Sequence, residues 1–273
     1  VRLGGPGVIR GAGWRRRGNM DLNRAGVFIT GGTGGIGAAL ASAFNGAGAT
    51  VVTSDLPGRG ADVDLDVTDA AAVARAVADL ERLEVVVANA GIGVGGLVDD
   101  IDRAGWDRSI EVNIQGAVNT VLPAYARMRD QGSGSIVLMA SVSGLVGTPL
   151  LAPYAMTKHA LVGLAASLRP EAARHGVGVT VVCPGPVETP LLEVAGATPG
   201  MQVRRHLTNA AGKPMRPEDL AAAVVDGVRR DRAQVIAPGR TRLIARLARW
   251  APRATAKQLA RAMDEEIAAA RRA

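Results

Sequence analysis

Short apolar runs alternate with longer segments of helical periodicity along most of the chain. Six runs of five to seven residues are mostly apolar at successive positions: 26–30, 49–54, 84–90, 135–141, 177–183 and 233–238. Five other segments carry apolar residues at helical spacing: 38–48, 69–83, 113–131, 154–176 and 217–231. Strands that are apolar on both faces, separated by helices, are typical of a parallel sheet covered on both sides. The pattern predicts a single doubly wound α/β domain, a Rossmann fold with about seven parallel strands.

In such a sheet the ligand site lies at the carboxyl ends of the strands, so the loops that follow strands matter most. The first of these loops, residues 31–37, holds five glycines in seven residues, between a predicted strand and a predicted helix. Glycines let the backbone approach a pyrophosphate, and the helix N-terminus supplies free N–H groups. Two spacings fit the loop: G-x-G-x-x-G from Gly32, and T-G-x-x-x-G-x-G from Thr30. We expect the second to be the functional one, which makes Gly32 and Gly34 surplus.

Asp55 ends the second predicted strand, near the position where an acidic residue accepts hydrogen bonds from a ribose, about 20 residues beyond the loop. A carboxylate there repels a 2′-phosphate, so NAD is predicted as the cofactor and NADP is disfavoured. Arg59 lies nearby and keeps NADP open as the alternative.

Tyr154 and Lys158 stand four residues apart in a predicted helix and therefore share a face. A neighbouring ammonium favours the phenolate and lowers the tyrosine pKa from its usual value near ~10. Such a phenol can exchange a proton with an alcohol or carbonyl oxygen. Taken alone, this pair fits an ordinary helix as well as a catalytic one.

Together with further motifs, the chain resembles the short-chain dehydrogenases/reductases of the ordinary NAD(P)-dependent kind. The resemblance covers about residues 21–239. The motifs that carry it are T-G-x-x-x-G-I-G at Thr30–Gly37, D-V-T at Asp66–Thr68, N-A-G at Asn89–Gly91, Asn113, Ser141 placed 13 residues before Tyr154, and P-G-P-V-E-T at Pro184–Thr189.

The resemblance implies four catalytic residues. Tyr154 is expected as the general acid/base, and Lys158 as the residue that binds the nicotinamide ribose and lowers the Tyr154 pKa. Ser141 is expected to polarise the substrate oxygen, and Asn113 to support a water-linked proton relay through Lys158. The expected cofactor-binding residues are Thr30, Gly31, Thr33, Gly34, Gly35, Ile36, Gly37, Asp55, Asp66, Val67, Asn89, Ala90, Gly91, Tyr154, Lys158, Pro184, Gly185, Val187 and Thr189. Gly34 stands where NADP-preferring members often have Arg or Lys, which again favours NAD.

Residues 191–215 lie where this family covers its substrate, and their small residues and glycines predict a mobile lid. Arg204, Arg205 and His206 in this segment could meet an acidic substrate, although a solvated surface is the favoured interpretation. The apolar loop 142–153 favours a hydrophobic secondary alcohol or ketone.

The two ends of the chain carry its positive charge. The formal net charge is +7; residues 1–19 contribute five arginines and residues 240–273 a net +6, which leaves the middle at −4. We expect residues 1–19 to be a disordered extension before a start at Met20. Residues 240–273 are expected to form a basic amphipathic helical tail, broken at Pro252. Contact of residues 241–271 with an anionic membrane and docking on the protein itself or on a partner subunit remain alternatives.

Composition limits the compartment, the metal content and the partners that we expect for this protein. A lone cysteine excludes an intramolecular disulfide and fits a cytoplasmic location, with the inner membrane surface as an additional site of contact. No metal-ligand spacing is present, so no metal is expected. The acidic middle and the scarcity of aromatic residues argue against a nucleic-acid partner. The resemblance implies a homodimer or homotetramer, formed through the helix that carries Tyr154 and the helix before it.

The sequence therefore predicts an NAD-dependent alcohol dehydrogenase/ketoreductase with a small-molecule substrate. Two alternatives remain open: an epimerase or dehydratase on the same fold, whose usual members have a larger C-terminal substrate domain, and a non-catalytic NAD(H)-sensing protein. Intact Ser141, Tyr154 and Lys158 argue against the sensor.

Overall fold

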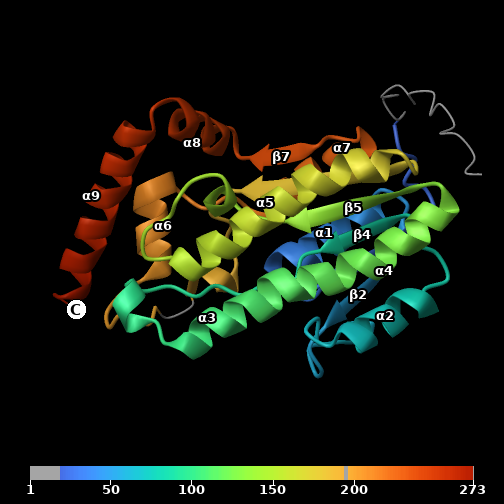
Figure 1. The fold of residues 1–273 in the computed structure, drawn as a ribbon, viewed down its shortest axis with the longest axis horizontal. Helices are drawn as coiled ribbons and strands as arrows, with labels where there is room; N and C mark the ends of the chain where they lie inside the picture. The colour runs from blue at the N-terminus through green and yellow to red at the C-terminus, as the bar shows by residue number, and fades with distance from the viewer. Residues whose placement is uncertain (1–18, 194–195, 273) are drawn as a thin grey trace, which may run out of the picture.

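A parallel β-sheet forms the centre of the molecule (Figure 1). The computed structural model describes residues 19–193 and 196–272, so all but Asn19 of the predicted disordered extension lies outside the described residues. The described part contains a seven-stranded sheet in the order β3-β2-β1-β4-β5-β6-β7, with every pair parallel. The strands are β1 (Gly26–Thr30), β2 (Thr50–Asp55), β3 (Val63–Asp64), β4 (Val85–Ala88), β5 (Gly134–Met139), β6 (Val177–Pro184) and β7 (Gln234–Ala237). The predicted doubly wound Rossmann fold is confirmed.

Helices cover both faces of this sheet. The helices are α1 (Gly35–Gly46), α2 (Ala70–Asp79), α3 (Arg103–Ile110), α4 (Gly116–Gln131), α5 (Ala152–Ala173), α6 (Val203–Ala211), α7 (Pro217–Arg229), α8 (Gly239–Trp250) and α9 (Pro252–Ala270). Helices α1 and α7 pack together on one face, and α2, α4 and α5 cover the other. The predicted break at Pro252 separates α8 from α9. Within the described residues, no helix has the length and apolarity needed to cross a bilayer.

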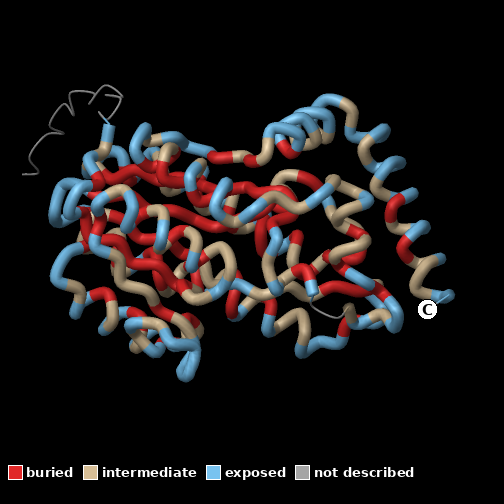
Figure 2. Tube along the Cα trace, turned by 180° about the vertical axis from the view of Figure 1, so that it is seen from behind, coloured by how far each residue is buried: buried red, intermediate tan, exposed pale blue. Residues whose placement is uncertain are grey.

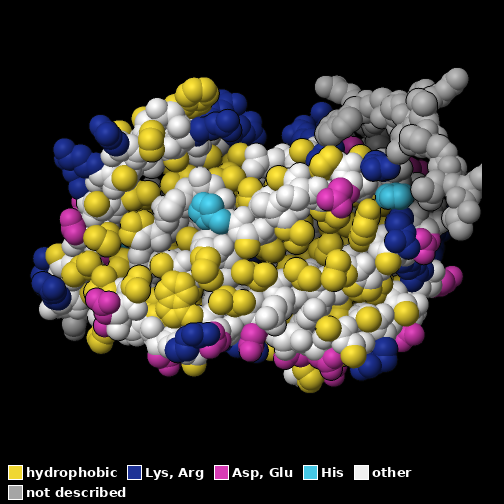
Figure 3. All heavy atoms as spheres, viewed as in Figure 1, with side chains coloured by type: hydrophobic (Ala, Val, Ile, Leu, Met, Phe, Trp, Pro, Cys, Tyr) yellow, Lys and Arg dark blue, Asp and Glu magenta, His cyan; other side chains and the backbone are white. Residues whose placement is uncertain are grey.

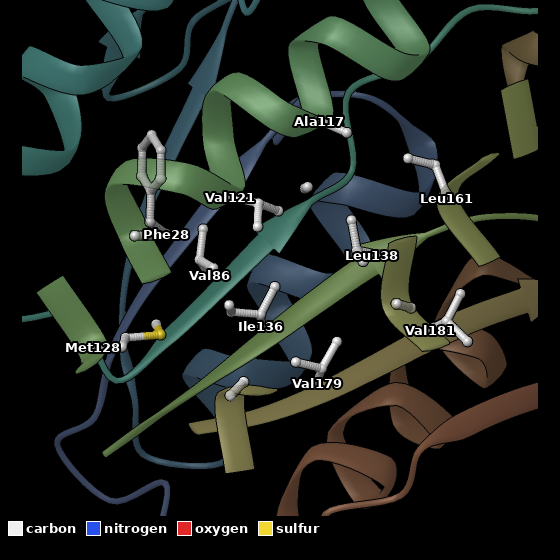
Figure 4. Close-up of a cluster of buried hydrophobic side chains, with 14 of the residues drawn as sticks. Phe28, Val86, Ala117, Val121, Met128, Ile136, Leu138, Leu161, Val179 and Val181 are labelled. Carbon is white, nitrogen blue, oxygen red and sulfur yellow. The ribbon is translucent and has the colours of Figure 1, made fainter. Parts of the chain in front are cut away.

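The core explains why the strands are apolar at successive positions. Val86 of β4 packs with Phe28 and Ile136 on the α4 side, whereas its neighbours Val85 and Val87 pack on the α1–α7 side. Successive strand side chains point to opposite faces, and here both faces are buried. Figure 4 shows the cluster on the α4 side. Buried residues therefore run through the whole central layer, while exposed residues lie on the outer helices and loops (Figure 2).

The strand order places the ligand site. The chain turns to opposite sides of the sheet after β1 and after β4, which are neighbours, so the crevice lies between their carboxyl ends. Thr30 and Ala88 end these two strands. Helices α6, α8 and α9 gather at the same end of the molecule (Figure 1).

Three elements depart from the predicted pattern. Strand β3 has only two residues, too short for a visible apolar run. Helix α6 forms within the segment expected to be a mobile lid, and its residues Val203 and His206 are buried. The predicted helix 113–131 is preceded by α3, and the two are joined through a π-helical turn at Glu111–Gln115.

Candidate active site

A cavity of about 400 Å³ opens at the carboxyl ends of β1, β4, β5 and β6. Most residues predicted to bind the cofactor or to act in catalysis line it. They are Gly31, Gly34, Gly35, Ile36, Gly37, Asp55, Asp66, Val67, Asn89, Ala90, Gly91, Ser141, Tyr154, Lys158, Pro184, Gly185, Val187 and Thr189. Thr30, Thr33 and Asn113 are not among the lining residues; they hold the lining residues in place from behind.

Close contacts explain why the loop after β1 needs glycine. Gly31 has a φ of +63°, and a Cβ there would lie 2.9 Å from the Cα of Ala90. A Cβ on Gly35 would lie 2.7 Å from the Cγ2 of Thr189, and one on Gly37 would collide with the carbonyl oxygen of Gly31. These three glycines are those of the T-G-x-x-x-G-x-G spacing, which the packing favours.

The two glycines expected to be surplus differ from each other. Gly34 has open space, because a Cβ there would have no neighbouring atom closer than 3.8 Å. Gly32 is not surplus: a Cβ there would lie 2.6 Å from the Cβ of Thr53 on the neighbouring strand. Its role is to let the loop pass close to β2.

Thr30 ties the glycine loop to the segment after β4. Its buried Oγ1 accepts hydrogen bonds from the backbone N–H groups of Asn89 and Ala90, at 3.1 and 3.2 Å. The Asn89 side chain donates in return to the carbonyl oxygens of Thr30 and Gly31, at 3.0 and 2.9 Å. The two loops that would flank the cofactor are thus one hydrogen-bonded unit.

Two carboxylates mark the outer part of the cavity. Thr33 donates to Asp55 Oδ2 through its hydroxyl at 2.5 Å and its backbone N–H at 3.2 Å. Asp66 accepts from the backbone N–H and the hydroxyl of Thr68 at 2.9 and 2.8 Å. These bonds, the backbone one foremost, and the charge of Arg108 lower the pKa of Asp66 against the opposing effect of burial. Arg108 of α3 also lines the cavity, a residue that the motifs did not reveal.

The glycine cradle, Asp55 and the Asn89–Gly91 segment line one cavity and fit a dinucleotide. The cradle would receive the pyrophosphate and Asp55 a ribose. In the described part of the chain, no group of three or more His, Cys, Asp or Glu side chains is placed to hold a metal ion.

Tyr154 and Ser141 line the cavity close to each other. Burial raises the pKa of the Tyr154 phenol, a hydrogen bond with the Ser141 side chain opposes this rise, and the nearby Cys183 adds to it. Ser141 Oγ also accepts from the backbone N–H of Ser143 at 3.1 Å, which orients the hydroxyl. Cys183 is fully buried, and burial raises its pKa to about 11, so it stays a thiol.

Lys158 lies beneath the tyrosine ring. Its Nζ donates to the carbonyl oxygen of Met139 at 2.8 Å and is 5.5 Å from the centroid of the Tyr154 ring. Burial lowers the pKa of Lys158 to about 8. In the protein chain by itself, burial raises the pKa of Tyr154, and Lys158 is not among the groups that shift it. The lowering of the Tyr154 pKa by Lys158 beside a bound nicotinamide stays a prediction.

Asn113 occupies the π-helical turn and joins three segments. Its Oδ1 accepts from the backbone N–H of Ile92 at 2.8 Å, and its Nδ2 donates to Ile92 O at 3.0 Å and to Thr157 Oγ1 at 3.1 Å. A Cβ on Gly91 would lie 3.1 Å from Asn113 Oδ1 and 3.4 Å from Lys158 Nζ. Asn113 and Lys158 therefore approach the same short stretch of backbone.

The far end of the cavity, which we call the substrate end, is apolar. It is built by the loop after β5, residues 190–192, and helices α6, α8 and α9. The larger apolar side chains that these segments contribute are Val142, Val146, Leu151, Leu191, Leu192, Val203, Leu207, Ile244 and Leu259. In the described part of the chain, none of the lining residues from these segments is charged.

The three basic residues of the lid segment do not reach the cavity. Arg204 pairs with Glu188 and Glu193, and Arg205 pairs with Glu266. His206 is fully buried, with Nε2 3.0 Å from the carbonyl oxygen of Pro149. The idea that these side chains meet an acidic substrate is therefore wrong, because all three are engaged within the protein.

Comparison with known proteins identifies the family. Residues 25–199 match the family model described as short chain dehydrogenase, so the chain belongs to the short-chain dehydrogenase/reductase family of oxidoreductases. It is 36% identical to 2-(S)-hydroxypropyl-CoM dehydrogenase 3 of Xanthobacter autotrophicus, over 73% of this chain and 87% of the relative. It is 34% identical to cis-4-hydroxycyclohexanecarboxylate dehydrogenase of Sinomonas cyclohexanicum, over 72% and 86%.

A solved structure of a short-chain dehydrogenase/reductase has a similar fold. A short-chain dehydrogenase/reductase from Burkholderia phymatum in complex with NAD superposes with a TM-score of 0.75 at 25% identity, covering 84% of this chain and 94% of that chain.

Proposed function

We propose that this protein transfers a hydride between NAD(H) and an uncharged, hydrophobic secondary alcohol or ketone. The observation that carries the proposal is the convergence of Ser141, Tyr154 and Lys158 in one cavity with the glycine cradle and Asp55. Family membership supports a dehydrogenase or reductase, and the apolar substrate end supports the substrate class.

Each side chain then has one task. The nicotinamide, when bound, supplies or accepts the hydride. In the oxidation direction the alcohol carbon gives up a hydride, and the hydroxyl proton passes to the Tyr154 oxygen, which must first have lost its own proton to act as the base. The positive charges of Lys158 and of the oxidised nicotinamide would favour that phenolate. Ser141 hydrogen-bonds to the same substrate oxygen. Lys158, held by the Met139 carbonyl, places a positive charge below the phenol and passes its proton toward Asn113 and solvent.

NAD is the proposed cofactor because Asp55, which is hydrogen-bonded by Thr33, lines the cavity at the end of β2, where an acidic residue is expected to bind a ribose. A carboxylate there would repel the 2′-phosphate of NADP. Arg59 and Arg108 line the same part of the cavity and keep NADP as the second candidate.

The test is a panel of secondary alcohols and ketones, followed by NADH absorbance with NAD and NADP in parallel. We expect NAD-linked turnover of apolar members of the panel. NADH binding without turnover of any member would instead favour the sensing protein, and exchange of stereochemistry without net redox change would favour an epimerase.

We also propose a homodimer or homotetramer formed through α4 and α5. Leu122 on α4 and Met156 on α5 have 61% and 41% of their surfaces exposed, which leaves apolar area for a partner copy on these helices. Light scattering coupled to size exclusion tests this: a monomer at micromolar concentration would rule it out, and Leu122→Glu should shift a dimer toward monomer.

The outer face of α8 supports a further proposal of contact with an anionic membrane surface. Leu243, Leu247 and Trp250 are 57%, 49% and 81% exposed on this helix. Exposed basic side chains gather over this part of the molecule (Figure 3). They include Arg242, Arg246 and Arg249 of α8 and Arg253 at the start of α9. Basic amphipathic faces with a tryptophan are typical of helices that lie in a bilayer interface.

Flotation with vesicles rich in phosphatidylglycerol tests this contact. The protein should float, and Leu247→Gln/Trp250→Gln should remain at the bottom. If both proteins stay at the bottom, α8 does not bind membranes; a concentration-dependent dimer that the double variant loses would instead favour docking to a partner subunit.

A further inference from the structure

Helices α8 and α9 follow the last strand and lie outside the residues that match the family model. Both nevertheless contribute to the catalytic cavity, through Ile244 of α8 and Leu259 of α9. One turn beyond Leu259, Met263 packs in an apolar cluster that includes Tyr154 and Leu151. The C-terminal helices therefore contribute to the substrate end of the cavity, and α9 packs against the same apolar cluster as Tyr154.

Helix α9 is held in this place by a buried carboxylate. The Glu266 side chain has no exposed surface. Its Oε2 accepts from Arg205 Nε at 2.7 Å, and its Oε1 accepts from Arg205 Nη2 at 2.7 Å and from the backbone N–H of Gln202 at 2.8 Å. The pair is bidentate, the strongest geometry that arginine and a carboxylate can adopt.

The same contact caps α6. Gln202 precedes the first residue of α6, so Glu266 places a negative charge at the N-terminus of that helix. Burial tends to raise the pKa of Glu266, but the bonds from Arg205 and Gln202 and the charge of Arg205 together lower it. Glu266 thus stays ionised at neutral pH and joins α9 to α6 (Figure 1), both of which line the substrate end.

The charge balance of this contact affects the substrate as well. Arg205 is directed to Glu266 and Arg204 to Glu188 and Glu193, so neither offers a cation to the cavity. A carboxylate at the substrate end would lose its hydration without gaining a partner, which is unfavourable.

We propose that α8 and α9 form the outer wall of the substrate compartment, anchored to α6 by Glu266, and that Ile244 and Leu259 select uncharged alcohols with an apolar chain beyond the carbinol carbon. The inference rests on the proposed hydride transfer. For that reaction, Ile244 and Leu259 are specificity-determining residues and Glu266 is a positioning residue.

The specificity arm uses 2-butanol, 2-octanol and 3-hydroxybutyrate with NAD. The wild type should prefer 2-octanol, and it should use 3-hydroxybutyrate at least about tenfold less well than 2-butanol. Leu259→Ala should lower the ratio of kcat/KM for 2-octanol to that for 2-butanol by roughly tenfold, because apolar contacts are lost only for the longer chain. Gln258→Ala, the exposed neighbour of Leu259 on α9, is the matched control and should leave the ratio unchanged.

The anchoring arm compares Glu266→Gln with Glu265→Gln, its exposed neighbour on α9. Hydrogen exchange of the α6 and α9 amides should accelerate in Glu266→Gln alone, and KM for 2-octanol should rise while kcat for 2-butanol changes little. If Glu266 had a purely structural role, Glu266→Gln would lower kcat for 2-octanol and for 2-butanol together.

The outcomes separate the two claims. If the wild type oxidises no alcohol, the proposed function fails, and the anchoring is still decided by hydrogen exchange. If alcohols are oxidised but Leu259→Ala lowers kcat/KM for 2-octanol and for 2-butanol equally, the wall does not select the substrate. The same conclusion follows if the wild type prefers 3-hydroxybutyrate. Unchanged exchange in Glu266→Gln overturns the anchor.

Discussion

The two ends of the cavity are built in different ways. At the cofactor end, backbone atoms, glycines and polar side chains make a connected set of hydrogen bonds, as Thr30 does with Asn89 and Ala90. At the substrate end, side chains such as Leu151, Val203 and Leu259 form an apolar wall without charge in the described residues. The cofactor end is thus shaped for one kind of ligand, whereas the substrate end is defined by volume and apolarity.

Tyr154 stands where the two ends meet, so its substitution has the largest expected effect. Tyr154→Phe removes the proton donor and should lower kcat by about a thousandfold or more, within the range of general acid–base catalysis. NADH binding, measured by fluorescence, should persist. Retention of wild-type turnover would mean that another group handles the proton.

Lys158, buried where the two ends of the cavity meet, should make the free energy of unfolding depend on pH. Its pKa is about 8 in the folded protein, below the 10.5 of a free lysine, so the unfolded state binds more protons between these values. The contribution of Lys158 to the free energy of unfolding should therefore rise with pH from about 8 to 10.5, by at most about 3 kcal/mol. Cys183 and Tyr154, whose pKa values burial raises, act in the opposite direction above about 9, so the difference between the wild type and a Lys158 variant isolates the amine. Urea titrations compare the wild type with Lys158→Met, which should lack this rise. Parallel pH dependence in both proteins would contradict the buried-amine interpretation.

Gly35 tests whether the cofactor end depends on close backbone approach. Gly35→Val would place side-chain atoms between the loop and Thr189 and should weaken NADH binding by roughly a hundredfold, the upper range for overpacking. The matched control is Gly46→Val at the end of α1, where no atom lies within 4 Å. Calorimetric titration with NADH measures both; equal affinities would show that the glycine cradle does not hold the cofactor.

Asp55 has the smallest expected effect, because it changes the choice between two cofactors and not their chemistry. Asp55→Asn removes the charge that repels a 2′-phosphate and should shift the ratio of kcat/KM for NADP to that for NAD upward by about tenfold. The same rates measured with Asp62→Asn, a carboxylate that instead binds Thr53, provide the control. An unchanged ratio in Asp55→Asn would mean that Arg59 or Arg108, and not Asp55, determines the choice between NAD and NADP.

The same contrast explains how far the sequence predicts the structure. The cofactor end follows from short motifs, because glycine spacing and Asp55 act within one β-α-β unit. No motif marks Arg108, because its position at the cavity depends on how α3 packs. The loop spacing does not reveal the need for Gly32, because its close neighbour Thr53 lies on another strand. The wall formed by Ile244 and Leu259 depends on how the C-terminal helices fold back, which periodicity alone does not specify.

The central claim is that one cavity brings a nicotinamide and an apolar alcohol together over Tyr154. The most direct measurement is oxidation of 2-octanol deuterated at the carbinol carbon, with the reduced cofactor analysed by mass spectrometry and NMR. We predict one deuterium at C4 of NADH with the wild type and none above background with Tyr154→Phe. NADH formed without deuterium, or no NADH formed from any alcohol in the panel, would contradict the account.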